Sequence, residues 1–263
     1  MHEDRIHPNL VVESSDSVQT LRIDRPERLN ALSSSMVDSL IDWARAVSSD
    51  RTLRACIITG TGRAFVAGAD ISEYDGVSQS GFDAYQRKSR RMFDSVAEIS
   101  HPTIAAVNGY ALGGGLELAL SCDFMIVSET AKLGLPEVKL GLLPGGGGTQ
   151  RLARLVGQAR AKELIMTGRS MTAAEAVGYG AALDSVPAEI LIERSGQLAA
   201  LLARNAPIAV AEIKRVVADG TDCSLAAGLT LEQRALSGLF ATDDATEGIQ
   251  AFIEKRDAHF SGA

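Results

Sequence analysis

The sequence has few residues that could form disulfides or a structural metal site. Its three cysteines, Cys56, Cys122 and Cys223, are widely separated, and its four histidines show no ligand spacing. Disulfide frameworks and zinc sites need such residues in clusters. We therefore expect a reduced chain with no structural metal.

An excess of positive charge is also missing. Lys and Arg total 26 against 33 Asp and Glu, which gives a net charge of −7. A chain of this charge has no general attraction for nucleic acid or for an anionic membrane. We predict neither as a partner, and any anionic ligand must be bound by local groups.

No segment has the pattern of a membrane span or a targeting signal. The most apolar stretch, residues 103–122, contains Asn108, Glu117 and several glycines, which makes it a poor span. The first residues are partly acidic and no apolar run follows them, unlike a secretory signal or a transit peptide. We expect a cytoplasmic protein.

The residues that are present predict an α/β fold. With 263 residues, 46% of them apolar, the chain can bury a sizeable core. Short β-branched runs bounded by turn residues predict strands at 10–12, 18–23, 56–59, 103–107 and 124–127. A helical period at 34–48 lies between them, and this alternation is typical of α/β proteins.

The last third of the chain reads as helical. Predicted helices lie at 158–166, 173–177, 187–203, 209–217, 225–239 and 244–260. Thr172 with Glu175, and Asp244 with Glu247, have the spacing of a capping box at a helix start. The polar, Gly- and Ser-rich segment 72–82 is predicted to be a loop or lid.

Three glycine-rich elements lie where a strand pattern gives way to a helix pattern, at 68–70, 113–115 and 145–148. Glycines of this kind can simply serve tight turns. They also leave backbone N–H groups uncovered, and such groups bind anions at helix starts. The nucleotide-binding patterns GxxxxGK[ST] and GxGxxG are absent. Uncovered amides without a phosphate ligand can stabilise an oxyanion, which suggests carbonyl chemistry.

Two glutamates are candidates for acid–base chemistry. Glu117 is the only charged residue in the most apolar stretch, although it could also cap its helix through the amides of the preceding glycine turn. Glu137 follows Pro136, which is also an ordinary pair in a first helical turn. A nucleophile has less support, because no Gly-x-Ser-x-Gly pattern occurs and Cys122 is far from His101 in the sequence.

Several long motifs resemble the enoyl-CoA hydratase (crotonase) superfamily. The similarity extends over essentially the whole chain. The matching segments are RLNAL (28–32), RAFVAGADISE (63–73), AVNGYALGGGLELA (106–119), LPEV (135–138), PGGGGTQRL (144–152), TGRSMTAAEA (167–176) and TDDATEGIQAFIEKR (242–256).

The resemblance implies a fold, an activity and a site. The fold is a crotonase-like spiral of ββα units over residues 1–200, with a helical C-terminal trimerisation region over 201–263. The activity is reversible hydration of a trans-2-enoyl-CoA to a 3-hydroxyacyl-CoA, as in fatty-acid β-oxidation, with no metal and no cofactor other than the coenzyme A of the substrate. Glu117 and Glu137 would be catalytic, and the amides of Ala69 and Gly114 would form the oxyanion hole. The implied substrate-binding residues are Arg28, Ala31, Ala67, Ala69, Asp70, Ile71, Ser72, Gly114, Gly145, Phe252 and Lys255.

Two of these expectations concern coenzyme A itself. Arg25 and Arg28 are candidate partners for its phosphates, and Phe252 and Lys255 would reach it from a neighbouring subunit. The chain departs from the family pattern at Leu116, Ser72 and 181–184, which leaves the acyl chain length open. Isomerase or other specialised acyl-CoA chemistry is the alternative activity. A non-enzymatic acyl-CoA-binding or RNA-binding role is a third, and the negative charge argues against RNA.

The C-terminal helices predict an assembly. They carry long apolar faces in a region with no sheet to cover. Such faces can pack on the chain's own core, but large apolar patches usually mark an interface. With the resemblance, they predict a homotrimer or a dimer of trimers.

Overall fold

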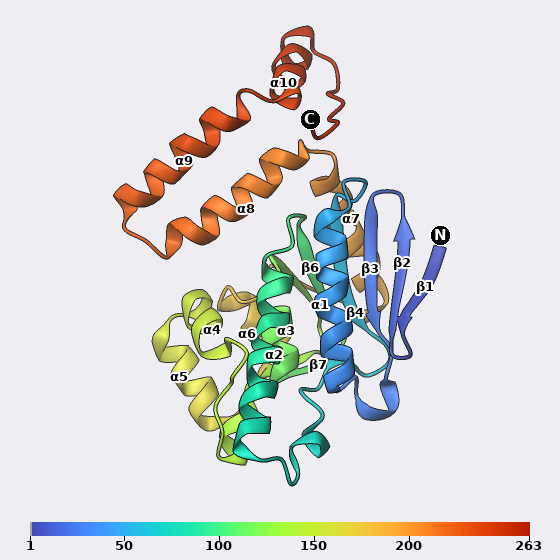
Figure 1. The fold of residues 1–263 in the computed structure, drawn as a ribbon, viewed down its shortest axis with the longest axis vertical. Coiled ribbons are helices and arrows are strands. Elements are labelled where there is room, and N and C mark those ends of the chain that lie inside the picture. The colour runs from blue at the N-terminus through green and yellow to red at the C-terminus, as the bar shows by residue number, and fades with distance from the viewer. Residues whose placement is uncertain (1) are drawn as a thin grey trace.

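The computed structural model describes residues 2–263. It contains a seven-stranded sheet and a four-stranded sheet with helices around them, and a group of helices that projects from one end (Figure 1). The large sheet comprises, in order, β1 (His2–His7), β2 (Leu10–Ser15), β3 (Val18–Ile23), β4 (Ala55–Gly60), β6 (Thr103–Val107), β8 (Phe124–Ser128) and β11 (Asp184–Val186). The small sheet comprises β10 (Ser170–Thr172), β9 (Lys132–Gly134), β7 (Tyr110–Leu112) and β5 (Ala64–Val66).

The chain alternates between the two sheets. The large sheet is antiparallel from β1 to β3 and parallel from β3 to β11. Each of β4, β6 and β8 is followed directly by a short strand of the small sheet, namely β5, β7 and β9. This repeat confirms the predicted α/β spiral. All five predicted strands belong to the large sheet, whereas the three-residue strands of the small sheet are too short to show a period in the sequence.

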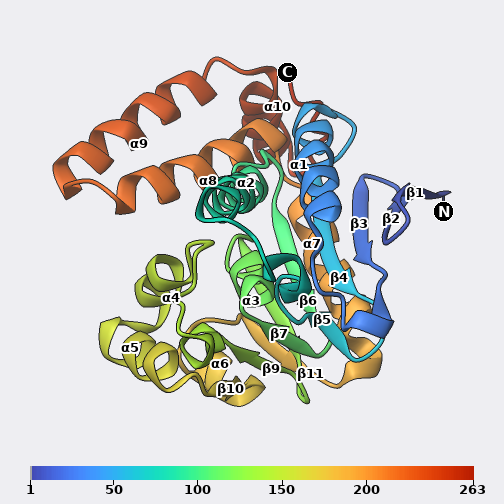
Figure 2. The same cartoon turned by 60° about the horizontal axis from the view of Figure 1, so that its bottom comes forward.

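Helices cover the sheets and project from them (Figure 2). The short 3₁₀ helices are η1 (Pro26–Arg28), η2 (Ile71–Tyr74), η3 (Pro136–Leu140) and η4 (Ala188–Ile190). The α-helices are α1 (Ser34–Ser49), α2 (Gln79–Ala97), α3 (Gly114–Ala119), α4 (Gly148–Val156), α5 (Gln158–Thr167), α6 (Ala173–Gly178), α7 (Leu191–Ala203), α8 (Pro207–Thr221), α9 (Leu225–Leu239) and α10 (Asp243–Glu254).

Helix α2 corrects part of the prediction for 72–82. Ser78 caps this helix by accepting a hydrogen bond from the Gly81 amide, so the second half of the predicted loop is helical. The buried residues of α2, Met92, Phe93 and Val96, all lie in its C-terminal half. Because its first turns bury no side chain, the sequence shows no apolar period there.

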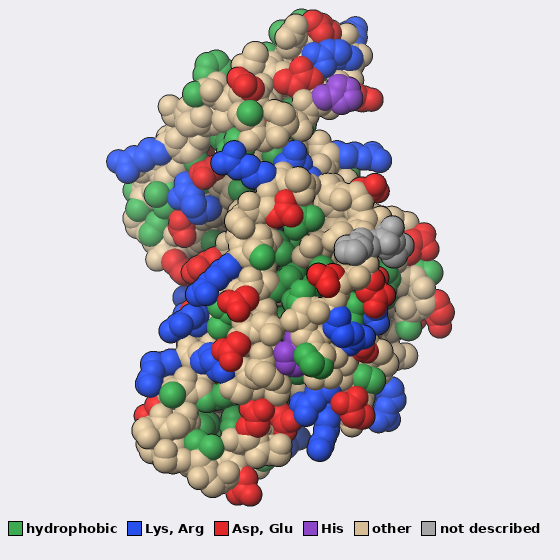
Figure 3. Space-filling model, turned by 45° about the vertical axis from the view of Figure 1, so that its right-hand side comes forward, with side chains coloured by type: hydrophobic (Ala, Val, Ile, Leu, Met, Phe, Trp, Pro, Cys, Tyr) green, Lys and Arg blue, Asp and Glu red, His purple; other side chains and the backbone are tan. Residues whose placement is uncertain are grey.

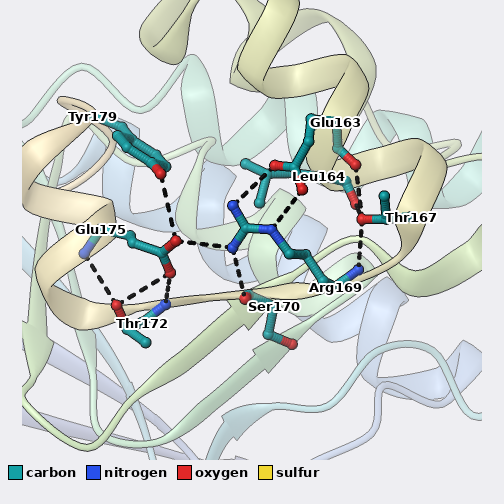
Figure 4. A network of polar contacts seen from close by, with 8 residues as sticks. All are labelled: Glu163, Leu164, Thr167, Arg169, Ser170, Thr172, Glu175 and Tyr179. Carbon is teal, nitrogen blue, oxygen red and sulfur yellow. Dashed lines mark hydrogen bonds and ion pairs between the residues drawn. The ribbon is translucent and has the colours of Figure 1, made fainter.

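A network of polar contacts around Arg169 joins helix α5 to helix α6 (Figure 4). Its guanidinium donates to Glu163 on α5 (2.6 Å) and to Glu175 on α6 (2.9 Å). Thr172 and Glu175 form the predicted capping box at the start of α6. Since α5 also packs on η3, this network supports the segment that carries Glu137.

The predicted helix boundaries need three corrections. The segment 187–203 is the 3₁₀ turn η4 followed by α7, and the last helix ends at Glu254, where Lys255 takes a left-handed conformation (φ 56°). The cap of α10 is Thr242 rather than Asp244. The buried Asp244 carboxylate instead accepts the amides of Ser261 and Gly262.

The last three helices differ from the rest of the chain. Helix α7 packs on β4, β6 and β8, so the predicted boundary at residue 200 falls inside a helix of the core. Helices α8 and α9 contain no buried residue, and they run beside each other away from the sheets (Figures 1 and 2). An ion pair between Lys214 on α8 and Asp123 (2.8 Å) ties them to the core.

The surface of the molecule carries charges of both signs. Figure 3 shows acidic and basic side chains interspersed over one face. Within residues 2–263, no helix is both long and apolar enough to cross a membrane.

Candidate active site

Two segments that are far apart in the sequence lie side by side. The Leu32 amide donates to the Gly68 carbonyl (2.9 Å), and the Asp70 amide donates to the Leu32 carbonyl (2.9 Å). The Ala67 amide donates to the Leu29 carbonyl (3.0 Å). This pairing brings together seven of the predicted substrate-binding residues, which are Arg28, Ala31, Ala67, Ala69, Asp70, Ile71 and Ser72.

Arg25 and Arg28 have different surroundings. The Arg25 guanidinium donates to the Ala31 carbonyl (3.0 Å) and to the Asp70 carboxylate (2.8 Å). Hydrogen bonds from the Ser72 hydroxyl and from Arg25 lower the pKa of Asp70. Arg25 is therefore bound within the chain, whereas Arg28 is exposed.

The amides of Ala69 and Gly114 lie close together. Gly114 is the first residue of α3, and a Cβ atom placed on it would lie 3.7 Å from the Ala69 nitrogen. Within residues 2–263, neither amide donates a hydrogen bond to another backbone or side-chain group. Gly115 cannot carry a side chain, because a Cβ there would collide with the Val66 carbonyl. Two backbone donors without a partner in the described chain thus lie close together.

Glu117 is a buried carboxylate whose orientation is fixed. Its Oε1 accepts hydrogen bonds from the amides of Gly146 (2.7 Å) and Gly148 (2.8 Å). These amides belong to the 145–148 turn, so Glu117 does not cap its own helix through residues 113–115. Burial raises the pKa of Glu117, while the two amides and the charge of Arg151 oppose that rise.

Glu137 is held less firmly than Glu117. It lies in the first turn of η3, and a Cβ on Gly113 would come within 3.0 Å of its Oε1. Its Oε2 is buried without a hydrogen-bond partner in the described chain. Burial and the negative charge of Glu117 raise the pKa of Glu137 to about 7. A carboxyl group with these properties can exchange a proton near neutral pH.

The structure adds residues that the sequence did not indicate. Tyr74, on η2, packs edge-on against Phe82 and Tyr85, with ring centroids 5.5 and 5.2 Å away. Burial raises the pKa of Tyr74, a hydrogen bond with Tyr85 opposes that rise, and the charges of Glu117, Glu73 and Glu137 add to it. The phenol therefore interacts electrostatically with both candidate carboxylates. Gln86 on α2 lies against Gly145. No local pattern marks these residues, since only the fold brings α2 and η2 to the site.

Three further predictions concern groups outside this site. Phe252 lies on α10 and Lys255 caps the end of that helix, and both are exposed. Helix α10 lies at the opposite end of the molecule from α5 (Figure 1). Burial raises the pKa of the Cys122 thiol to about 12, so this cysteine is a poor nucleophile at neutral pH. Residues 2–263 contain no cluster of three or more His, Cys, Asp or Glu side chains that could hold a metal ion.

Two uncovered amides beside two carboxylates, in a two-sheet α/β spiral, are typical of enzymes that stabilise an oxyanion while moving a proton. The sequence model of the enoyl-CoA hydratase/isomerase family matches residues 13–263, and the chain belongs to this family.

Individual relatives agree with this assignment. The chain is 42% identical to a probable enoyl-CoA hydratase of Mycobacterium bovis, over 97% of this chain and 98% of that protein. It is 39% identical to the 2,3-dehydroadipyl-CoA hydratase of Escherichia coli, over 96% and 98%. The crystal structure of an enoyl-CoA hydratase from Bacillus anthracis superposes with a TM-score of 0.94 at 40% identity, covering 97% of this chain and all of that one.

Proposed function

We propose that the protein catalyses the reversible addition of water to a trans-2-enoyl-CoA, giving a 3-hydroxyacyl-CoA. The observation that carries this proposal is the pair of carboxylates with opposite surroundings. Glu117 has two amide donors that stabilise its ionised form, whereas Glu137 has a buried oxygen without a partner. Environments that differ in this way separate a base from an acid.

In the hydration direction, the Glu117 carboxylate positions a water molecule and takes its proton as the oxygen attacks C3. Negative charge then develops on the thioester oxygen, where the amides of Ala69 and Gly114 stabilise it. Gly145, in the turn that holds Glu117, helps to orient the water. The reaction requires no metal or redox cofactor.

Glu137 completes the reaction by delivering a proton to C2. A pKa of about 7 lets this carboxyl carry a proton at neutral pH and regain it from solvent. Because hydration is reversible, the same groups work in the opposite order during dehydration. The substrate lies with its coenzyme A part along the paired segments at 28–32 and 67–72, where Arg28 is exposed.

A second candidate activity is migration of the double bond in an enoyl-CoA. The properties of Glu137 favour it, because a single carboxyl that exchanges a proton near neutral pH is sufficient for isomerisation.

The relative that acts on 2,3-dehydroadipyl-CoA further suggests acyl groups with a polar end as substrates. The phenol of Tyr74 and the amide of Gln86 are polar groups near the carboxylates that could contact such an end.

Glu117→Gln separates the two activities. We expect wild-type protein to hydrate crotonyl-CoA, and the variant to lose hydration while any exchange of C2 protons with solvent persists. An isomerase rate on a 3-enoyl-CoA that exceeds hydration in wild type, and survives the substitution, would favour the second activity. Folded wild-type protein that does not hydrate crotonyl-CoA would contradict the first.

We also propose that the working form is a homotrimer or a dimer of trimers. The exposed apolar side chains of α9 and α10 support this proposal, since several are more than half exposed in one chain. They are Leu225, Leu236, Phe240, Ile249, Phe252 and Ile253. In such an assembly α10 of one subunit could bring Phe252 and Lys255 to the coenzyme A site of its neighbour.

A further inference from the structure

A chain of polar contacts connects Glu117 to helices α4 and α2. The turn at 145–148 supplies both amides that bind Glu117, so the position of this turn sets the position of the carboxylate. Arg151, on α4, donates to the carbonyl of Gly146 (2.8 Å). The amide and the carbonyl of Gly146 belong to neighbouring peptide groups. The Arg151 guanidinium therefore fixes the turn next to the amide that binds Glu117.

The arginine is itself fixed. Its second terminal nitrogen donates to Asp94 on α2 (3.1 Å), and Asp94 also accepts two hydrogen bonds from Arg90 (2.8 and 2.7 Å). Arg151 and Asp94 are largely covered, with 22% and 33% of their side chains exposed. An ion pair with limited exposure and bonds at both ends has a defined geometry.

The turn is shaped around this guanidinium. Gly147 has a φ of 108°, which disfavours any other residue, and a Cβ atom there would collide with the Arg151 side chain. A Cβ on Gly146 would collide with Phe93 of α2 and lie 2.7 Å from Oε2 of Glu117. The backbone thus passes between the arginine on one side and the carboxylate on the other.

We propose that Arg151, clamped by Asp94, is a positioning residue for Glu117. It holds the 145–148 turn so that two amides keep the carboxylate aimed at the reacting water, and its charge favours the ionised carboxylate. The reference to water rests on the function proposed above. Arg151 is the charged side chain that shifts the pKa of Glu117, and Glu117 in turn raises the pKa of Glu137 and of the Tyr74 phenol.

The charge of Arg151 lowers the pKa of Glu117, so its removal has a defined sign. Arg151→Gln raises the pKa of Glu117, because it removes a nearby opposite charge. Asp94→Asn removes a negative charge and leaves the Arg151 charge unopposed, so it does not raise that pKa. A role in packing alone predicts no such difference, because both substitutions break the same contact between α2 and α4.

The test measures the Glu117 carboxyl directly. Protein labelled with ¹³C at the glutamate side-chain carboxyls is titrated by NMR, and the Glu117 signal is identified by its absence in Glu117→Gln. We expect an upward shift in Arg151→Gln, a value near wild type in Arg151→Lys, and no upward shift in Asp94→Asn. An unchanged value in Arg151→Gln, or upward shifts in both Arg151→Gln and Asp94→Asn, would overturn the proposal.

Kinetics supply the second measurement. In Arg151→Gln we expect kcat for hydration of crotonyl-CoA to fall about tenfold or more while KM changes little, because the arginine does not touch substrate. The acidic limb of the kcat/KM profile moves to higher pH with the Glu117 pKa. Arg154→Gln is the matched control, since Arg154 lies on the same helix with 58% of its side chain exposed. It should retain wild-type kinetics.

The two measurements keep this proposal separate from the proposed function. If folded wild-type protein fails to hydrate crotonyl-CoA, the proposed function fails, and the NMR titration still tests the role of Arg151. If wild type hydrates and the Arg151→Gln titration matches wild type, the role of Arg151 fails alone. If Arg151→Gln does not fold, Arg151→Met, which also removes the charge, takes its place in the titration with the same expected upward shift.

Discussion

The sheet-bearing core and the last three helices bury their apolar side chains to very different extents. The core encloses large side chains such as Phe65, Met92 and Phe93 at 2% exposure or less, whereas α8 and α9 bury none. The two candidate carboxylates and the two unpaired amides belong to the core, where backbone amides are held by pairing between strands and turns. The C-terminal helices carry exposed apolar faces that the same chain does not cover. We infer that one region is built for chemistry and the other for assembly.

The sharpest test of the core's role is Glu117→Gln. This substitution keeps the shape of the side chain and removes the base, so hydration should fall by about a thousandfold. Thermal unfolding should change little, because Gln can still accept both amide hydrogen bonds. Glu129→Gln, at an exposed position, is the control for the loss of a charge. Retained hydration in Glu117→Gln would remove this residue from the mechanism.

The C-terminal helices are tested by placing charge on their apolar face. Leu236→Lys on α9, where 59% of the residue is exposed, should split the assembly into chains of 27.7 kDa. Wild type should have a mass of 83.1 kDa for three chains, or twice that for six. Gln233→Lys, at another exposed position of the same helix, should leave the mass unchanged. Light scattering that gives a stable wild-type monomer would contradict this account.

Glu137 links the site to stability. Its pKa is raised from an ordinary value of 4.5 to about 7, so between these values the folded chain binds more protons than the unfolded chain. Stability therefore falls as pH rises through this window, and it stays lower above pH 7. Glu137→Gln removes that loss, and we expect it to unfold at a higher temperature than wild type at pH 8 but not at pH 4. Equal differences at both pH values would contradict the raised pKa.

The smallest expected effect concerns the proposed contact between α10 of one subunit and the coenzyme A site in the core of its neighbour. Lys255→Ala should raise KM for enoyl-CoA a few-fold and leave kcat nearly unchanged, as expected for a binding group that does not distinguish the transition state. The effect should vanish in the Leu236→Lys background if Lys255 acts on a neighbouring subunit. A matching fall in kcat, or the same KM change in both backgrounds, would argue against a cross-subunit contact.

The sequence revealed the parts of the fold that repeat locally. The strands of the large sheet and helices such as α1 and α9 have apolar periods or capping residues that can be recognised within one segment of the sequence. Helix α2 was missed because its first turns bury nothing, and the small sheet because its strands are only three residues long. The sequence of a single segment does not show features that depend on packing between distant elements.

The same limit applies to the site. Glu117 and Glu137 stand out because a charge in an apolar stretch needs an explanation. Tyr74 and Arg151 do not stand out, because nothing in the neighbouring sequence indicates that they are buried. Their proximity to the carboxylates depends on η2, α2 and α4 meeting in space, which only the fold determines.

The most direct test of the central claim is the reaction of crotonyl-CoA in D₂O, followed by NMR. The account predicts 3-hydroxybutyryl-CoA with one deuterium at C2, formed by wild type and lost in Glu117→Gln and Glu137→Gln. A product of this kind requires that one site adds the water and delivers the C2 proton. In wild type, deuterium exchange at C2 without addition of water, or no reaction by folded protein, would contradict it.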